Sequence, residues 1–130
     1  MIKALDHVAL VTTDVHRAAR FYIEALGFRE TMRLETTHSG TIIFVGLGGC
    51  QVELFGNGKP KDPKQSPYGG EQVGYKHITL LVDSVDEECA RLKARGVEFF
   101  MDPTDVESGM RLAFFKDPDG NAIELLQKPQ

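Results

Sequence analysis

Apolar and polar positions alternate along two segments of the chain, LDHVALVTTD at 5–14 and YKHITLLVD at 75–83. Alternation with a period of two, in stretches rich in β-branched residues, is typical of a strand with one buried face. Behind the first strand, at 15–27, apolar residues recur every three or four positions, which indicates an amphipathic helix. A capping signal opens a second helical segment at 85–96. The sequence thus predicts a strand followed by a helix in each half of the chain.

The ends of both predicted helices carry their own signals. Asp14 stands where its side chain can cap the first helix, and Ser84 forms a capping box with Glu87 before the second. Gly27 and Gly96 stand where a left-handed residue is needed to end a helix. These residues bound the two helices independently of their apolar pattern.

Three further strands follow each helix. Short turn signals, HSG and GG, separate the first set, and the loop DPTDVESGM interrupts the second. The strands are predicted near 28–37, 41–47, 50–55, 97–101, 111–116 and 121–127. The residues between the two sets, 56–74, are rich in Gly, Pro and Lys and lack periodicity, which is typical of a linker or a functional flap.

The two halves also repeat residues that can carry chemistry. His7 and His77 lie 70 positions apart, and Glu53 and Glu124, in the matching strands GCQVELF and GNAIELL, lie 71 apart. Self-similarity at a fixed spacing indicates two copies of one supersecondary unit. We therefore predict a single α+β domain, 1–130, built from tandem βαβββ modules at about 4–55 and 75–127 that are joined by a linker, 56–74.

Strand alternation assigns the repeated residues to faces. His7 shares one side of its strand with Ala9, and His77 shares one side with Thr79. The opposite, aliphatic sides suit packing against the helices. If the two modules curl toward each other, the polar sides line a cup, a partly open β-barrel with its helices outside, and both His–Glu sets reach one point.

Two imidazoles and two carboxylates suit one divalent first-row metal ion, such as Zn, Ni, Co, Mn or Fe. A cation would also compensate the two acids, which are costly to bury alone. Taken singly, a His at a strand start is more often an ordinary core or edge residue, and a strand Glu is usually solvated. Because both residue types recur at both equivalent positions, we predict a metal site formed by His7, Glu53, His77 and Glu124.

Composition narrows the classes of partner. Fifteen Lys and Arg against nineteen Asp and Glu leave a formal charge of −4, with no basic stripe to suit nucleic acid. No apolar stretch reaches the roughly 20 residues of a membrane helix, and the start MIKALDH lacks a signal-peptide core. We expect a cytoplasmic protein that binds a small molecule. Cys50 and Cys89 are expected to be small thiols packed in the interior.

The chain resembles the vicinal oxygen chelate superfamily, which includes glyoxalase I, methylmalonyl-CoA epimerase, extradiol dioxygenases and fosfomycin-resistance thiol transferases. The matching stretches span nearly the whole chain, and the last is the most specific: LDHVAL, RFYIEALGF, VELF, YKHITLLV and FFKDPDGNAIELL. The resemblance implies tandem βαβββ modules that form a metal cup, with ligands from the first and last strand of each module. Modules in this family pair either within one chain or across a two-fold axis. The form that the resemblance implies is a homodimer with two sites.

Glu53 separates the chemistries within this family. The order His, Glu, His, Glu resembles glyoxalase I, whereas the epimerase has Gln at the second position and the dioxygenases and thiol transferases use three protein ligands. The resemblance implies a lyase or isomerase that transfers a proton next to a carbonyl, while the metal polarises two vicinal oxygens and holds an enediolate. In that mechanism Glu124 carries the proton and Glu53 is the second candidate base.

Val11 departs from the glyoxalase pattern. Bacterial glyoxalase I carries an Arg there, four residues after the first ligand, that helps to grip the carboxylates of glutathione. Glutathione is therefore in doubt as a substrate, although other cations of the chain are candidates for the same role: Arg29, Arg33, Arg111 and lysines 59, 61 and 64.

Two alternatives to the glyoxalase-type enzyme stay open. The chain can be another metal enzyme of the family, such as an epimerase, a ring-cleaving dioxygenase or a thiol transferase. It can also be a binding module that sequesters a small molecule without chemistry.

Overall fold

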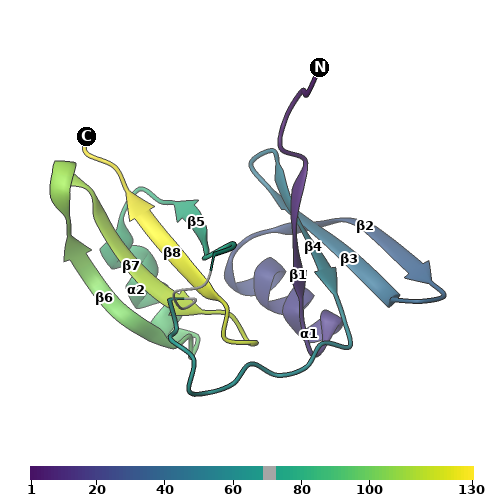
Figure 1. Cartoon of the computed structure of the whole chain (residues 1–130). Helices are drawn as coiled ribbons and strands as arrows, with labels where there is room; N and C mark the ends of the chain where they lie inside the picture. The colour runs from purple at the N-terminus through teal and green to yellow at the C-terminus, as the bar shows by residue number, and fades with distance from the viewer. Residues whose placement is uncertain (69–72) are drawn as a thin grey trace. The chain divides into compact units, whose positions relative to one another are not determined.

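Two four-stranded sheets, each with its own helix, make up the protein (Figure 1). The computed structural model describes residues 1–68 and 73–130. The chain divides into two compact units, Met1–Pro60 and Lys61–Gln130, and each is described by itself. We refer to them as module 1 and module 2.

Module 1 begins with strand β1 (His7–Val11) and helix α1 (Val15–Arg20), which continues as the π-helical turn η1 (Phe21–Ala25). Its sheet has the order β1-β4-β3-β2, in which β1 pairs with β4 in parallel and the other neighbours are antiparallel. The three remaining strands are β2 (Arg29–Thr36), β3 (Gly40–Leu47) and β4 (Cys50–Phe55).

Module 2 repeats this topology. Its sheet has the order β5-β8-β7-β6, again with one parallel pair, β5 with β8. Its elements are β5 (Ile78–Leu81), α2 (Val85–Ala94), β6 (Phe99–Asp105), the 3-10 turn η2 (Glu107–Gly109), β7 (Arg111–Lys116) and β8 (Ala122–Gln127). The predicted α+β fold of two tandem βαβββ modules is confirmed, and neither sheet closes on itself.

The helix of each module covers one face of its sheet, and the core lies between them. In module 1 that face carries Ile43 and Leu54, and in module 2 it carries Phe115 and Ile123, all fully or almost fully buried. Leu92 from α2 completes the second core. Because strand residues alternate, the residues between these buried ones lie on the opposite face.

The helices begin and end at the residues that carry the capping signals. The Asp14 carboxylate accepts hydrogen bonds from the backbone N–H groups of His16 and Arg17 at 3.1 and 3.0 Å, which holds the pKa of Asp14 below its usual value. The Ser84 hydroxyl accepts one from the N–H of Glu87 at 3.2 Å. Gly27 and Gly96 have φ angles of 83° and 86°, so both adopt the left-handed conformation expected of a helix end.

Two expectations need correction. Strand β6 runs on to Asp105 through Pro103, where the sequence suggests a loop from 102 onward. Proline is tolerated there because β6 is an edge strand and its pairing with β7 shifts register between Met101 and Thr104. Cys89 is buried as expected, but Cys50 is exposed at the start of β4, next to the turn that follows β3.

The described part of the connection between the modules, 56–68 and 73–74, forms neither helix nor strand. Residues 69–72 of the predicted linker lie outside the described residues. Among the residues that the structure does describe, no helix is long and apolar enough to cross a membrane.

Candidate metal site

In module 1, the parallel pairing of β1 with β4 brings His7 and Glu53 together. Ala9 lies beside Glu53 in the register, and His7 lies two residues earlier on the same face of β1. The Nε2 atom of His7 is 3.3 Å from Oε1 of Glu53. Two residues that are distant in sequence thus form one polar pair on the face opposite the helix.

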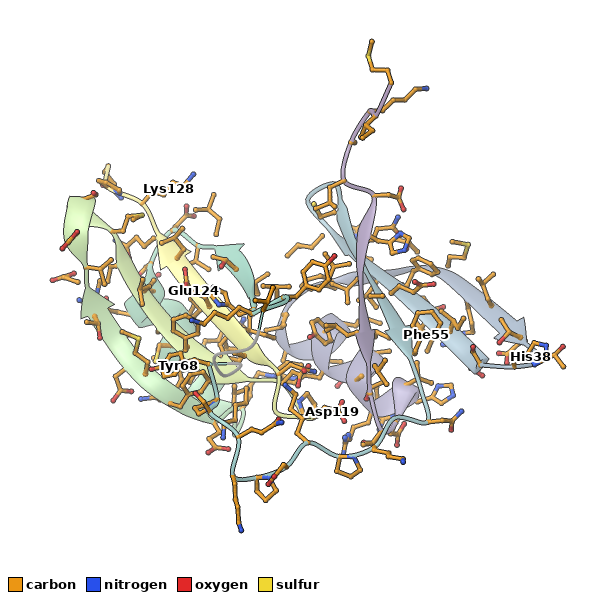
Figure 2. All side chains as sticks on the ribbon, in the orientation of Figure 1. His38, Phe55, Tyr68, Asp119, Glu124 and Lys128 are labelled. Carbon is orange, nitrogen blue, oxygen red and sulfur yellow. The ribbon has the colours of Figure 1, made fainter. Side chains whose placement is uncertain are left out.

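Module 2 builds the same pair from its own strands. Thr79 of β5 lies beside Glu124 of β8, and His77 immediately precedes β5. The Nε2 atom of His77 is 3.3 Å from Oε2 of Glu124, and Figure 2 labels Glu124 on β8. The repeat seen in the sequence is therefore a repeat of geometry.

An aromatic ring supports each pair, and sequence analysis missed both rings. Phe44 lies opposite Glu53 and packs edge-to-face on His7, with 5.2 Å between ring centroids. Phe114 lies opposite Glu124 and packs in the same way on His77 at 5.0 Å. Their spacing of 70 residues, equal to that of the two His residues, is the signal that would have found them.

The carboxylates are the more buried members of the pairs. Their side chains are 15% exposed at Glu53 and 14% at Glu124, against 35% and 24% for the two imidazoles. A carboxylate with so little access to water needs a hydrogen bond or a positive charge beside it. The neighbouring imidazole, or a cation held by both groups, meets that need.

Asp6 makes the outer contacts of the two histidines unequal. Its carboxylate oxygen Oδ2 lies 2.7 Å from Nδ1 of His7. This hydrogen bond, supported by the charge of Glu53, raises the pKa of His7 above its usual value. A proton on Nδ1 leaves Nε2 directed at Glu53 and available as a ligand atom. Lys76 occupies the matching position before His77.

The donor atoms and their separations fit a metal ion. Zinc bonds to imidazole nitrogen and carboxylate oxygen are about 2.0–2.2 Å long, so neighbouring ligand atoms around one ion lie roughly 3 Å apart. Both Nε2–oxygen distances, 3.3 Å, suit that geometry. Within neither module does the described structure hold a group of three or more His, Cys, Asp or Glu side chains that could bind a metal alone. Each module by itself supplies two of the four predicted ligands.

Val11 stands where bacterial glyoxalase I has an Arg that grips glutathione, and two of the cations that could replace that Arg form ion pairs with acids of their own module. Arg111 forms hydrogen bonds of 2.7–3.0 Å with Asp86 and Asp105, which raise its pKa and commit it to ion pairs within module 2. Arg33 pairs with Glu30 at 2.6 Å. Val11, at the position of that Arg, is apolar and 64% exposed on the face that carries His7.

The family model named glyoxalase/bleomycin resistance protein/dioxygenase superfamily matches residues 4–125. The chain belongs to this superfamily. Its tandem βαβββ modules and the repeated His–Glu pairs agree with that membership.

Similar proteins in this superfamily carry different names. A probable lactoylglutathione lyase of Vibrio cholerae is 33% identical over 95% of this chain and 90% of its own. A solved glyoxalase family protein from Enterococcus faecalis is 26% identical, with a TM-score of 0.81 over 96% of this chain and 98% of its own. TnmS3, an antibiotic binding protein from a Streptomyces species, is 28% identical, with a TM-score of 0.75 over 98% of both chains.

Proposed function

We propose that this protein is a metal-dependent lyase or isomerase of glyoxalase type that moves a proton next to a carbonyl of a small substrate with two vicinal oxygens. The observation that carries the proposal is the pair of matching His–Glu contacts, each 3.3 Å long, at equivalent places in the two modules. A divalent ion bound there would supply Lewis-acid polarisation of the substrate oxygens.

In this proposal the chain's own residues divide the work. His7 and His77 would hold the ion through Nε2, and Glu53 and Glu124 would complete the ligand set. Glu124 takes the proton from the substrate carbon and returns it to the neighbouring one, with Glu53 as the second candidate base. The low exposure of both carboxylates favours these roles, because water competes poorly for a covered base.

The proposal treats both modules as parts of one domain, 1–130, because four ligands require both pairs. It also includes a homodimer, as the resemblance to glyoxalases implies, and the cytoplasmic location expected from the sequence. The relative from Vibrio cholerae supports lyase chemistry by its name. Glutathione itself is not proposed as the thiol, because the apolar Val11 replaces the Arg that grips its carboxylates.

A binding module without chemistry is the second candidate function. TnmS3, which is named an antibiotic binding protein, shares the fold over 98% of both chains. Binding of a small molecule that is independent of metal would favour this candidate over the enzyme.

Elemental analysis of the protein purified without chelator tests the proposed site. We expect about one Zn, Ni, Co, Mn or Fe ion per complete set of four ligands. Glu124→Gln should weaken metal retention at least about tenfold, because an amide is a poorer ligand than a carboxylate. Glu107→Gln, which changes an exposed acid in η2, is the matched control and should retain the metal.

Turnover then tests the reaction. The metal-loaded protein should convert hemithioacetals of methylglyoxal formed with several thiols, and Glu124→Gln should lose that activity. Metal uptake without any turnover would reject the glyoxalase reaction but keep the metal site. No uptake of any of the five metals would reject the site itself.

A further inference from the structure

An aromatic cluster extends from the His77–Glu124 pair in module 2. Phe114, which packs on His77, also lies 5.3 Å from the ring of Tyr68 and 5.6 Å from the ring of Phe100. Tyr68 and Phe100 are themselves in edge-to-face contact at 4.9 Å. The three rings form one apolar cluster, with Phe114 buried at its centre, that reaches the imidazole of a proposed ligand.

The βαβββ fold does not require this cluster. Phe99 and Phe100 of β6 correspond, at a spacing of 70, to Arg29 and Glu30 of β2, and β2 contains no aromatic residue. Module 1 nevertheless forms the same sheet with the same strand order. Phe114 has an equivalent in Phe44 of module 1, so the additions of module 2 beside its half of the proposed site are Phe100 and Tyr68.

Tyr68 reaches this surface from the connection rather than from the sheet (Figure 2). The segment that carries it is shaped by local hydrogen bonds, from the N–H of Lys64 to Asp62 at 2.9 Å and from the N–H of Tyr68 to the Ser66 hydroxyl at 3.2 Å. Its ring contacts both phenylalanines, yet Tyr68 remains 37% exposed. The ring therefore still has surface to offer to a ligand.

We propose that Tyr68, Phe100 and Phe114 form a wall that binds an aryl group of the substrate, so that Tyr68 determines specificity at the proposed metal site. This inference rests on the proposed function. Aromatic rings favour edge-to-face and offset contacts with a further ring, and their burial adds affinity. The nearby Lys116, 6.0 Å over the Phe100 ring, also lies 3.8 Å from Glu98, so its charge is partly compensated.

The substrate class we infer is therefore a small compound with two vicinal oxygens next to an aryl group.

Two hydroxamates test the wall directly, because they share the same pair of chelating oxygens and differ only in the attached group. Affinities of benzohydroxamate and acetohydroxamate for the zinc-loaded protein are measured by titration calorimetry. We expect the phenyl compound to bind roughly tenfold more tightly to the unchanged protein, since burial of a phenyl ring is worth at least that factor.

Variants of Tyr68 separate the wall from the metal site. Tyr68→Ala and Tyr68→Leu should reduce the preference for the phenyl compound to about threefold or less and leave acetohydroxamate affinity within about twofold, since both remove the ring. Tyr68→Phe should retain the preference. Tyr75→Ala, at a fully exposed tyrosine, is the control and should retain it as well.

The outcomes distinguish the two proposals. An equal preference for the phenyl compound in the unchanged protein, Tyr68→Ala and Tyr68→Leu, with zinc bound normally, would overturn the aryl wall and leave the metal site standing. If the unchanged protein takes up no zinc, the metal site and the wall that depends on it are both rejected.

Discussion

Among the residues that the structure describes, Asp6 gives His7 a carboxylate partner on Nδ1, and His77 has no equivalent one. Its carboxylate lies 2.7 Å from Nδ1 of His7, whereas Lys76 precedes His77. A carboxylate behind a ligand imidazole fixes the tautomer and strengthens the ligand. The two halves of the proposed site are therefore unequal at the level of single residues.

Titration of His7 by NMR in the metal-free protein provides a test of that contact. We expect a pKa above the usual value of about 6.5, because the Asp6 hydrogen bond and the Glu53 charge favour the imidazolium. Asp6→Asn should lower the pKa toward the usual value, and Lys76→Asn should not change it. Equal titration curves for His7 with and without the Asp6 carboxylate would contradict the contact.

The raised pKa also fixes the sign of the pH dependence. In the metal-free protein, His7 binds a proton more tightly in the folded chain than in the unfolded chain. Its contribution to stability is therefore fully present below about pH 6.5 and is lost as the pH rises through the higher folded pKa.

The sequence was informative about the candidate site residues and less so about the residues that contact them. The repeated His and Glu stand out because imidazoles and carboxylates are unusual in half-buried strands. Phe44 and Phe114 were missed because an apolar residue in a strand looks like ordinary core. Asp6 was missed because sequence neighbours usually point away from each other along an extended chain.

Helix α2 shows how one element holds module 2 together. Leu92 is fully buried between α2 and its sheet, while Ala90, two residues earlier, is exposed. The helix lies on the face opposite the His77–Glu124 pair. It therefore stabilises the sheet without touching the proposed chemistry.

Leu92→Ala should lower the free energy of unfolding by about 2–5 kcal/mol, since it leaves a cavity in a packed core. Urea denaturation followed by circular dichroism measures the change. Ala90→Gln, on the exposed side of α2, should stay within about 0.5 kcal/mol of the unchanged protein. A Leu92→Ala protein as stable as that control would show that α2 contributes little to the core.

Element types were predictable, but some boundaries were not. Capping residues marked both helices, and alternation marked the strands. The π-helical turn Phe21–Ala25 could not be foreseen, because the apolar spacing of 15–27 does not distinguish it from an ordinary helical turn. The passage of β6 through Pro103 depended on its place at the sheet edge, which is a property of the topology and not of the local sequence.

At the scale of the whole molecule, the repeat predicted the topology of both modules. In residues 1–68 and 73–130, each sheet takes all four of its strands from its own module. Local patterns could therefore specify each module without specifying a cup. The cup-shaped arrangement and the union of the two His–Glu pairs stay predictions.

Metal-linked stability tests that union. Free zinc at about 100 times its dissociation constant should stabilise the folded protein by about 2.7 kcal/mol. We expect Glu53→Gln and Glu124→Gln each to remove most of this gain, although the residues belong to different modules. Thermal denaturation with and without zinc provides the measurement, and Glu107→Gln is the control. Full stabilisation of either ligand variant would indicate a site that lies within one module.

The last strand of each module, β4 or β8, lies inside its sheet, between the first strand and the third. During synthesis the first sheet has all its partners once Phe55 has left the ribosome, while the second waits for residues 122–127. At roughly 5–20 residues per second, the interval lasts several seconds. A nascent chain would then carry His7 and Glu53 on a folded sheet well before the second sheet forms around His77 and Glu124. If the proposed four-ligand site exists, it could bind its metal ion only after β8 is made.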